Sequence, residues 1–73
     1  MDIKARVGQR IKELRKSVGL SQEALANEAE VDRTYVTDVE NGRRNVSLEI
    51  LQRLIKALKV SIAEFFNSKE FKK

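Results

Sequence analysis

Residues 21–40 have the sequence SQEALANEAEVDRTYVTDVE, and this stretch decides the fold of the chain. Ser21 and Asp32 are residue types that cap the start of a helix, because their side-chain oxygens accept hydrogen bonds from free N–H groups of the first turn. An apolar residue precedes each cap and another follows it four positions later, which is the spacing of a hydrophobic staple. The stretch therefore predicts two short helices, at residues 22–29 and about 33–41, joined by a tight turn.

A longer helix is predicted before this stretch. Apolar residues repeat at three- and four-residue steps from Ile3 to Val18, which is one stripe on a helix. Gly19 then provides a left-handed stop, a conformation that glycine adopts without steric cost. We therefore expect the first helix over residues 3–18.

The pattern of apolar residue, cap and apolar residue returns twice after this stretch, at Val46-Ser47-Leu51 and Val60-Ser61-Phe65. It predicts helices at residues 48–58 and 62–67. The chain contains no proline that would interrupt them, and no alternating strand pattern competes. We expect an all-α fold: one compact five-helix bundle over residues 1–67, followed by a frayed tail at residues 68–73.

The second of the two short helices carries polar side chains suited to DNA bases. Val36 and Val39 should face the core, which leaves one exposed face: Arg33, Thr34, Tyr35, Thr37 and Asp38. Arginine can clamp guanine with two hydrogen bonds, and threonine can bond a base edge or touch a thymine methyl group. Asp38 has two interpretations: it accepts a hydrogen bond from cytosine, or it holds Arg33 or Arg44 in place.

Side chains that suit phosphates flank this helix. Gln22 begins the preceding helix, where a side-chain amide and free backbone N–H groups can grip a phosphate. Four more candidates lie at and after the end of the second short helix: Asn41, Arg43, Arg44 and Asn45. The net charge of +4 also favours an anionic partner such as nucleic acid.

The segment GLSQEALANEAEVDRTYVTDVENGRRNVS, residues 19–47, resembles the helix-turn-helix of the Xre/Cro/phage-repressor family, a lambda-repressor-like DNA-binding domain. The resemblance covers about residues 5–66, and its marks are Leu20-Ser21-Gln22, Leu25-Ala26, Val31, Tyr35-Val36 and Glu40-Asn41-Gly42. Residues 32–35 and 40–48 are similar to a narrower group, the controller proteins of restriction–modification systems. Those are small dimeric regulators that bind operators beside their own genes.

The resemblance implies roles for particular positions. In the wider family the Gln22 position grips phosphate, and four positions of the second short helix face bases: Arg33, Thr34, Thr37 and Asp38. The narrower group adds a DNA contact at Tyr35. The family also implies that Arg15 pairs with Glu40 and ties the first helix to this recognition helix.

Glu30 departs from the family, which usually has glycine at this turn position. Either the left-handed turn is kept, at a cost on the order of 1–2 kcal/mol for a non-glycine residue, or the preceding helix runs on and the turn differs.

These observations predict a sequence-specific transcriptional regulator that binds a double-stranded operator as a homodimer. A near-palindromic site would place the two recognition helices about 34–36 Å apart, one turn of DNA. The expected dimer interface is Val60, Ile62, Phe65 and Phe66. RNA polymerase is a further candidate partner. The alternatives are an antitoxin-type or phage lysogeny regulator of the same fold that also binds a protein, although the short tail after Phe66 leaves little room for a toxin-binding extension.

Other classes of protein are disfavoured by what the sequence contains. There is no histidine or cysteine, no serine with a plausible base and no glycine-rich phosphate loop, so we expect no enzyme, metal site, cofactor or small-molecule ligand. The sequence has neither an apolar run of about eighteen residues nor a signal peptide. We expect a bacterial or phage-encoded cytoplasmic protein, associated with the nucleoid through DNA. Membrane-surface binding is disfavoured because the core needs the apolar stripe of the first helix.

Overall fold

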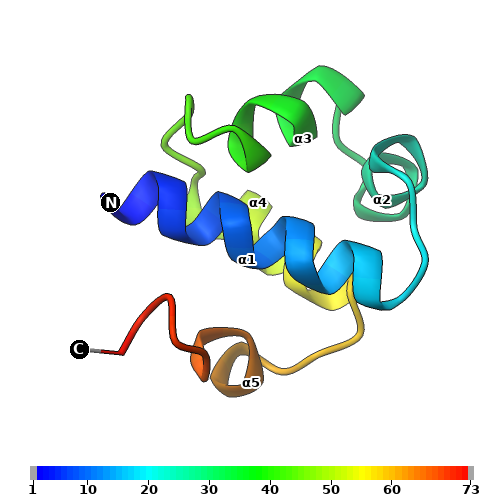
Figure 1. Cartoon of the computed structure of the whole chain (residues 1–73). Coiled ribbons are helices and arrows are strands. Elements are labelled where there is room, and N and C mark those ends of the chain that lie inside the picture. Colours follow the sequence, from blue (N-terminus) through cyan, green and yellow to red (C-terminus); the bar gives the residue numbers. More distant parts are fainter. Residues whose placement is uncertain (1, 73) are drawn as a thin grey trace.

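The computed structural model describes residues 2–72. These residues form helices and no strand, which confirms the expected all-α fold (Figure 1). The helices are α1 (Ile3–Ser17), α2 (Gln22–Ala29), α3 (Arg33–Glu40), α4 (Leu48–Ala57) and α5 (Ile62–Phe66). Each observed boundary differs from the predicted one by at most one residue. None of the helices within residues 2–72 has the length and apolar character needed to cross a bilayer.

The helices begin at the caps that the sequence predicts. Ser21 Oγ accepts a hydrogen bond from the Ala24 amide at 3.0 Å, and Asp32 Oδ1 accepts one from the Thr34 amide at 3.1 Å. Ser47 and Ser61 cap α4 and α5 in the same way. Such caps satisfy N–H groups that have no partner within the helix and are each worth roughly 1 kcal/mol. They therefore fix where each helix starts.

Four helices end with a residue in the left-handed conformation. Gly19 and Gly42 follow α1 and α3 with φ of 76° and 71°, whereas Glu30 and Lys59 follow α2 and α4 with φ of 58° and 63°. After α2, the Val31 amide donates to the Ala26 carbonyl at 2.9 Å, which is the long bond of a Schellman motif. The left-handed turn is thus kept although Glu30 stands where the family usually has glycine. The strain of Glu30 in this conformation is on the order of 1–2 kcal/mol.

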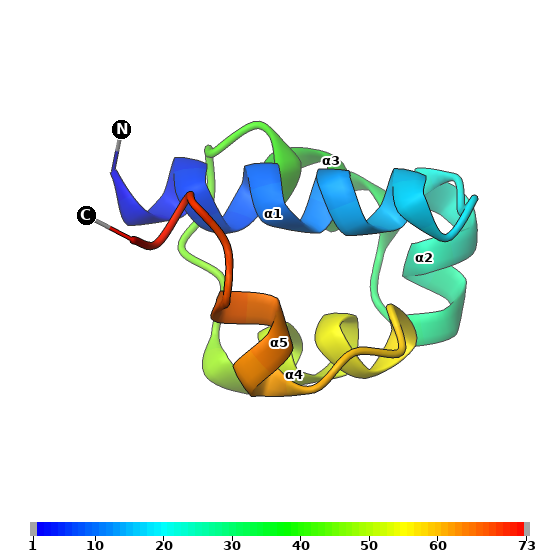
Figure 2. The same ribbon diagram turned by 60° about the horizontal axis from the view of Figure 1, so that its bottom comes forward.

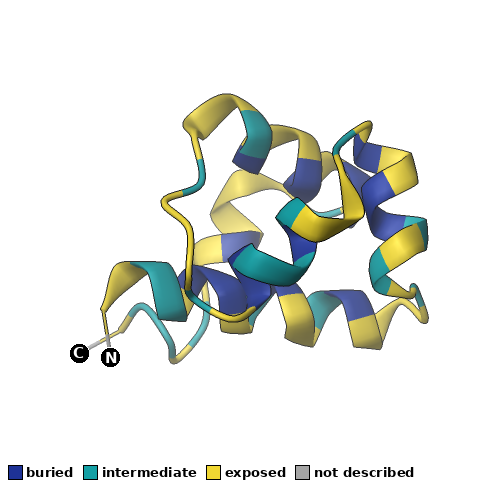
Figure 3. Cartoon of the chain, turned by 90° about the horizontal axis from the view of Figure 1, so that it is seen from above, coloured by how far each residue is buried: buried dark blue, intermediate teal, exposed yellow. Residues whose placement is uncertain are grey.

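The core lies between α1, α3 and α4, with α2 closing one end (Figures 1 and 2). Buried residues face inward from every helix, while the outer faces are exposed (Figure 3). The largest fully buried side chains are Phe65, Ile11, Leu25, Leu54, Leu58, Val36 and Val39. Val36 and Val39 hold α3 against the core from behind, so the opposite face of α3 points outward.

Close approach of α1 to α3 depends on Gly8. This residue is buried in the middle of α1, and a Cβ built there would overlap the carbonyl oxygen of Val39. Because a backbone oxygen cannot rotate away as a long side chain can, only glycine fits without moving one helix. Gly8 therefore sets how close the end of α3 lies to α1.

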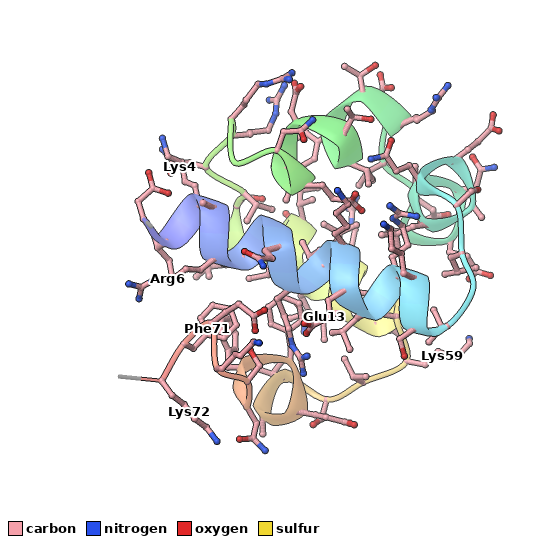
Figure 4. The ribbon with its side chains drawn as sticks, viewed as in Figure 1. Lys4, Arg6, Glu13, Lys59, Phe71 and Lys72 are labelled. Carbon is pink, nitrogen blue, oxygen red and sulfur yellow. The ribbon has the colours of Figure 1, made fainter. Side chains whose placement is uncertain are left out.

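The C-terminal segment folds back onto the domain. The Phe71 ring lies 4.8 Å from the Phe66 ring and 6.0 Å from the Phe65 ring between centroids, and Figure 4 shows Phe71 near α1 and α5. The expectation of a frayed tail at residues 68–73 is therefore wrong for residues 68–71, because aromatic packing orders them. Lys73 lies outside the described residues. The Ser68 hydroxyl donates to Glu70 at 2.5 Å and lowers the pKa of that carboxyl.

Arg10 ties α5 to α1. Its Nε donates to the Phe65 carbonyl at 2.7 Å and its Nη2 to the Glu64 carbonyl at 2.9 Å, while Nη1 pairs with Glu13 Oε1 at 2.6 Å. A cation at the C-terminal carbonyls of a helix offsets their partial negative charge. A helix of five residues is too short to be stable alone, so α5 depends on this anchor and on the burial of Phe65.

Candidate nucleic-acid interface

The outward face of α3 begins with exposed polar residues. Arg33 and Thr34 are exposed in the first turn, directly after the cap Asp32. Tyr35 is half-buried and packs against the core. Thr37 and Asp38 are also half-buried, on the second turn. The N-terminal half of α3 is thus the part that a groove of nucleic acid can reach first.

A buried ion pair holds the other end of α3. Arg15 Nε donates to Glu40 Oε2 at 2.6 Å and Arg15 Nη2 to Glu40 Oε1 at 3.0 Å, while Nη1 donates to the Leu20 carbonyl at 2.8 Å. The two side chains are 11% and 1% exposed. The hydrogen bonding to Glu40 raises the pKa of the Arg15 guanidinium. This two-bond geometry fixes the rotation of α3 relative to α1.

Gln22 joins α2 to the same network. Its Nε2 donates to Glu40 Oε1 at 3.0 Å, and its Oε1 accepts from the Thr37 hydroxyl at 2.8 Å. A carboxylate can only accept, so the orientation of the Gln22 amide is fixed by Glu40. The side chain of Gln22 is therefore engaged inside the protein, and only its second N–H remains for an outside partner. The Thr37 hydroxyl is likewise already bonded.

The loop after α3 carries exposed cations beside one carboxylate. Arg43, Arg44 and Asn45 are exposed. Asp38 accepts from Arg44 Nη2 at 3.4 Å and from Arg43 Nη1 at 3.5 Å. The Arg44 guanidinium lies 4.5 Å from the centre of the Tyr35 ring, a cation–π geometry. In the chain without DNA, Asp38 therefore contacts Arg44, as one of its two interpretations expects, and Arg43 in addition.

A second surface of the molecule is apolar. Ile3, Leu48, Ile62 and Phe66 are 59%, 85%, 56% and 37% exposed, and with Val46 they line two adjoining hollows between the start of α1, α4 and α5. We call these five residues the apolar face. Large exposed apolar side chains are unremarkable singly, but a contiguous group marks an interaction surface.

The expected dimer residues fall differently on this surface. Ile62 and Phe66 belong to the apolar face, and Val60 is half-buried against the core. Phe65 is fully buried and corrects our expectation, because its ring fills the core of its own domain and cannot reach a partner. Ile3 and Leu48, which also belong to the apolar face, were not among the expected residues. Leu48 lies on the apolar stripe of α4, but it is the first residue of that helix and is not among its buried residues.

No group of three or more metal-binding side chains gathers within the described range 2–72.

The matches to known proteins agree with this geometry. The helix-turn-helix family pattern matches residues 11–65. The control protein C.MunI from Mycoplasma sp is 44% identical over 70 residues, which cover 94% of this chain and 95% of that protein.

Two solved structures have the same fold at substantial identity. The restriction–modification controller protein C.AhdI from Aeromonas hydrophila superposes with a TM-score of 0.83 at 48% identity, covering 86% of this chain and 96% of that chain. The C.Esp1396I tetramer, in complex with its natural 35-base-pair operator, superposes with a TM-score of 0.92 at 35% identity over 100% of this chain and 99% of that chain. The chain therefore belongs to the helix-turn-helix family and, within it, to the restriction–modification controller proteins, and is a non-enzymatic, DNA-binding transcriptional regulator.

Proposed function

We propose that this regulator binds a near-palindromic operator as a homodimer, with one α3 helix in the major groove of each half-site. The observation that carries the proposal is the position of α3: its first turn is exposed, while Arg15 and Glu40 lock its last turn. A recognition helix needs both properties, because base contacts demand a projecting helix that does not rotate. The crystallised relative C.Esp1396I binds its own operator as a tetramer, which supports an oligomeric complex here.

In this arrangement Arg33 and Thr34 read base edges, and Tyr35 borders them. The half-buried Thr37 lies behind them on α3, with its hydroxyl turned to Gln22. The phosphate contacts come from the flanks of α3: the second N–H of Gln22, Asn41, Arg43, Arg44 and Asn45. Contacts of this second kind set the position of the protein but carry little sequence information.

Replacing Arg33 with alanine is expected to weaken operator binding by about 1–3 kcal/mol and to relax the preference at one base pair of each half-site. The reason is that a single bidentate arginine–guanine contact carries most of the discrimination at its position. Selection of bound duplexes from a random pool first supplies the operator. Titration of wild-type and variant protein on that operator, on its single-base variants and on a random duplex then measures the loss.

Arg6→Ala is the matched control, since Arg6 is an exposed arginine that points away from α3 (Figure 4). It should lower the affinity for the operator and for the random duplex equally, and by less than Arg33→Ala lowers the affinity for the operator. Equal losses on operator and random duplex for Arg33→Ala would show that Arg33 does not read bases.

We infer that the apolar face is where two copies meet. It supplies exposed Leu48, Ile62 and Phe66 next to the ends of α4 and α5, and a second copy would cover them by two-fold symmetry. A dimer would also add buried apolar surface to a domain of only 73 residues, which buries little by itself.

Replacing Leu48 with glutamine is expected to weaken dimerisation at least tenfold while leaving the folded monomer intact. Leu48 is 85% exposed in the single chain, so its loss removes apolar contact only in the dimer, where a buried leucine contributes about 1.5–3 kcal/mol per copy. Sedimentation equilibrium over a range of concentrations, with circular dichroism to check folding, measures both properties.

Val18→Gln provides the comparison, because Val18 is 48% exposed and lies outside the apolar face. An unchanged dimer constant for Leu48→Gln, or a wild type that stays monomeric with and without operator, would refute this interface.

The regulator would control the genes of the restriction–modification system to which its own gene belongs. It would act in the cytoplasm, where the operator lies. RNA polymerase is the protein that such a dimer would meet beside a promoter. Transcription from the selected operator, with and without the regulator, tests that encounter.

A further inference from the structure

Asp38 stands where a carboxylate is costly. Of the two carboxylates in α3, Glu40 is buried in its ion pair, with 1% of its side chain exposed, whereas the Asp38 side chain is 24% exposed. It lies on the helix that faces DNA in the proposed complex, where phosphates repel a negative charge. The contacts of the Asp38 side chain therefore have to explain why a carboxylate stands at this position.

Every polar contact of the Asp38 side chain in the described chain leads to the loop that follows α3. The carboxylate faces the guanidinium groups of Arg43 and Arg44 at 3.5 and 3.4 Å. The Asp38 carbonyl also accepts from the Arg43 amide at 2.9 Å, so the start of the loop is tied to the same residue through the backbone.

Arg44 is held from a second side. Its guanidinium lies over the Tyr35 ring at 4.5 Å, and Tyr35 itself packs against the core. An exposed arginine normally samples many rotamers, and ordering such a side chain on binding costs free energy. Here an anion and an anchored ring order Arg44 before any DNA arrives.

We propose that Asp38 is a positioning residue that increases the discrimination between operator and random DNA, and that it acts through Arg43 and Arg44 rather than on a base. This inference rests on the proposed function, since it requires α3 to face the operator. On random DNA the two arginines must exchange Asp38 for phosphates, or bring the carboxylate toward the backbone, and either event weakens binding. On the operator, contacts from Arg33 fix the register of α3. The ordered Arg44 then meets its phosphate without further loss of side-chain entropy.

Asp38→Asn in the full chain tests this inference, because it keeps the shape of the side chain and removes its charge. Affinity for a random duplex should rise about 1.4- to fivefold, the range that exposed ion pairs cover. Affinity for the selected operator should stay the same or fall, so the ratio of the two affinities falls. On the random duplex, the slope of log affinity against log salt concentration should steepen by about one, since a released arginine adds a phosphate contact.

Two further variants identify the route of the effect. Glu28→Gln changes the net charge equally, but Glu28 is exposed on α2 beside Arg53 and Lys59, away from the loop, so it should leave the affinity ratio unchanged. In a chain that carries Arg43→Gln and Arg44→Gln, the effect of Asp38→Asn on the ratio should disappear, which is the coupling that a double-mutant cycle measures.

Three results would overturn the inference. Equal gains on both duplexes would show simple charge repulsion, and unchanged affinity for both duplexes would show that the Asp38 charge has no role in binding. A loss on the operator alone that persists without the two arginines would show that Asp38 reads a base directly. In each of these cases the wild type still prefers its operator; a wild type with no preferred duplex would instead refute the proposed function itself.

Discussion

Replacing Arg15 with methionine is expected to lower the free energy of unfolding by about 3–5 kcal/mol. The substitution removes one partner of a buried ion pair and leaves the Glu40 carboxylate, 1% exposed, without its main compensating charge. A domain of 73 residues is held by only about 4–11 kcal/mol in total, so a large part of its stability would be lost. Urea denaturation followed by circular dichroism measures the change.

The double variant Arg15→Met with Glu40→Leu separates the cost of an unpaired charge from the cost of lost packing. Apolar residues of similar volume often replace a buried ion pair with little loss, so the double variant should be more stable than Arg15→Met alone. If the single variant lost less than about 1 kcal/mol, the pair would not be what secures α3 to α1.

Gly8→Ala is expected to destabilise the domain by about 1–3 kcal/mol, although alanine is the better helix former by roughly 1 kcal/mol. The added methyl group would overlap the Val39 carbonyl oxygen, and α1 and α3 would have to move apart. For a domain of this size the melting temperature should fall by about 4–8 °C for each kcal/mol lost. Because α3 moves with Val39, operator affinity should fall as well, and titration of the folded variant would detect it.

Gln9→Ala is the control for helix propensity, since Gln9 is the exposed neighbour of Gly8 on the same helix. It should keep or slightly raise the melting temperature. A Gly8→Ala variant that melted at or above the wild-type temperature would contradict the close contact between α1 and α3.

Much of the fold could be predicted because its signals are local. A capping side chain bonds to an amide two or three residues away, and a staple joins residues five positions apart, so both are visible in the sequence. Ser21, Asp32, Ser47 and Ser61 accordingly begin four helices as expected. Asp2 caps α1 by the same chemistry and could have been recognised.

The features that could not be predicted depend on how helices meet. The close approach of α1 to α3 at Gly8 arises between residues distant in sequence, and helical periodicity does not reveal it. Helical periodicity also gives no information on the exposure of Leu48 or on the return of Phe71 to the rings of Phe65 and Phe66. The same limit applies to the site. Residue type indicated that Gln22 and Asp38 are suited to DNA, but only the packing of α1, α2 and the loop reveals that their polar atoms are already engaged with Glu40, Thr37 and two arginines.

The hydrogen bonds from Arg10 to the last carbonyls of α5 have a consequence for operators. They tie α5, which carries Ile62 and Phe66 of the apolar face, to α1, and the Arg15–Glu40 pair ties α1 to α3. These ties would keep the distance from the apolar face to the recognition helix fixed in the proposed dimer. In the proposed dimer, one extra base pair between half-sites would turn the second half-site by about 34–36° around the DNA axis, given roughly 10–10.5 base pairs in each turn. Such a dimer would bind both half-sites only at one spacing. On operators with a different spacing, only one of its two recognition helices would bind a half-site.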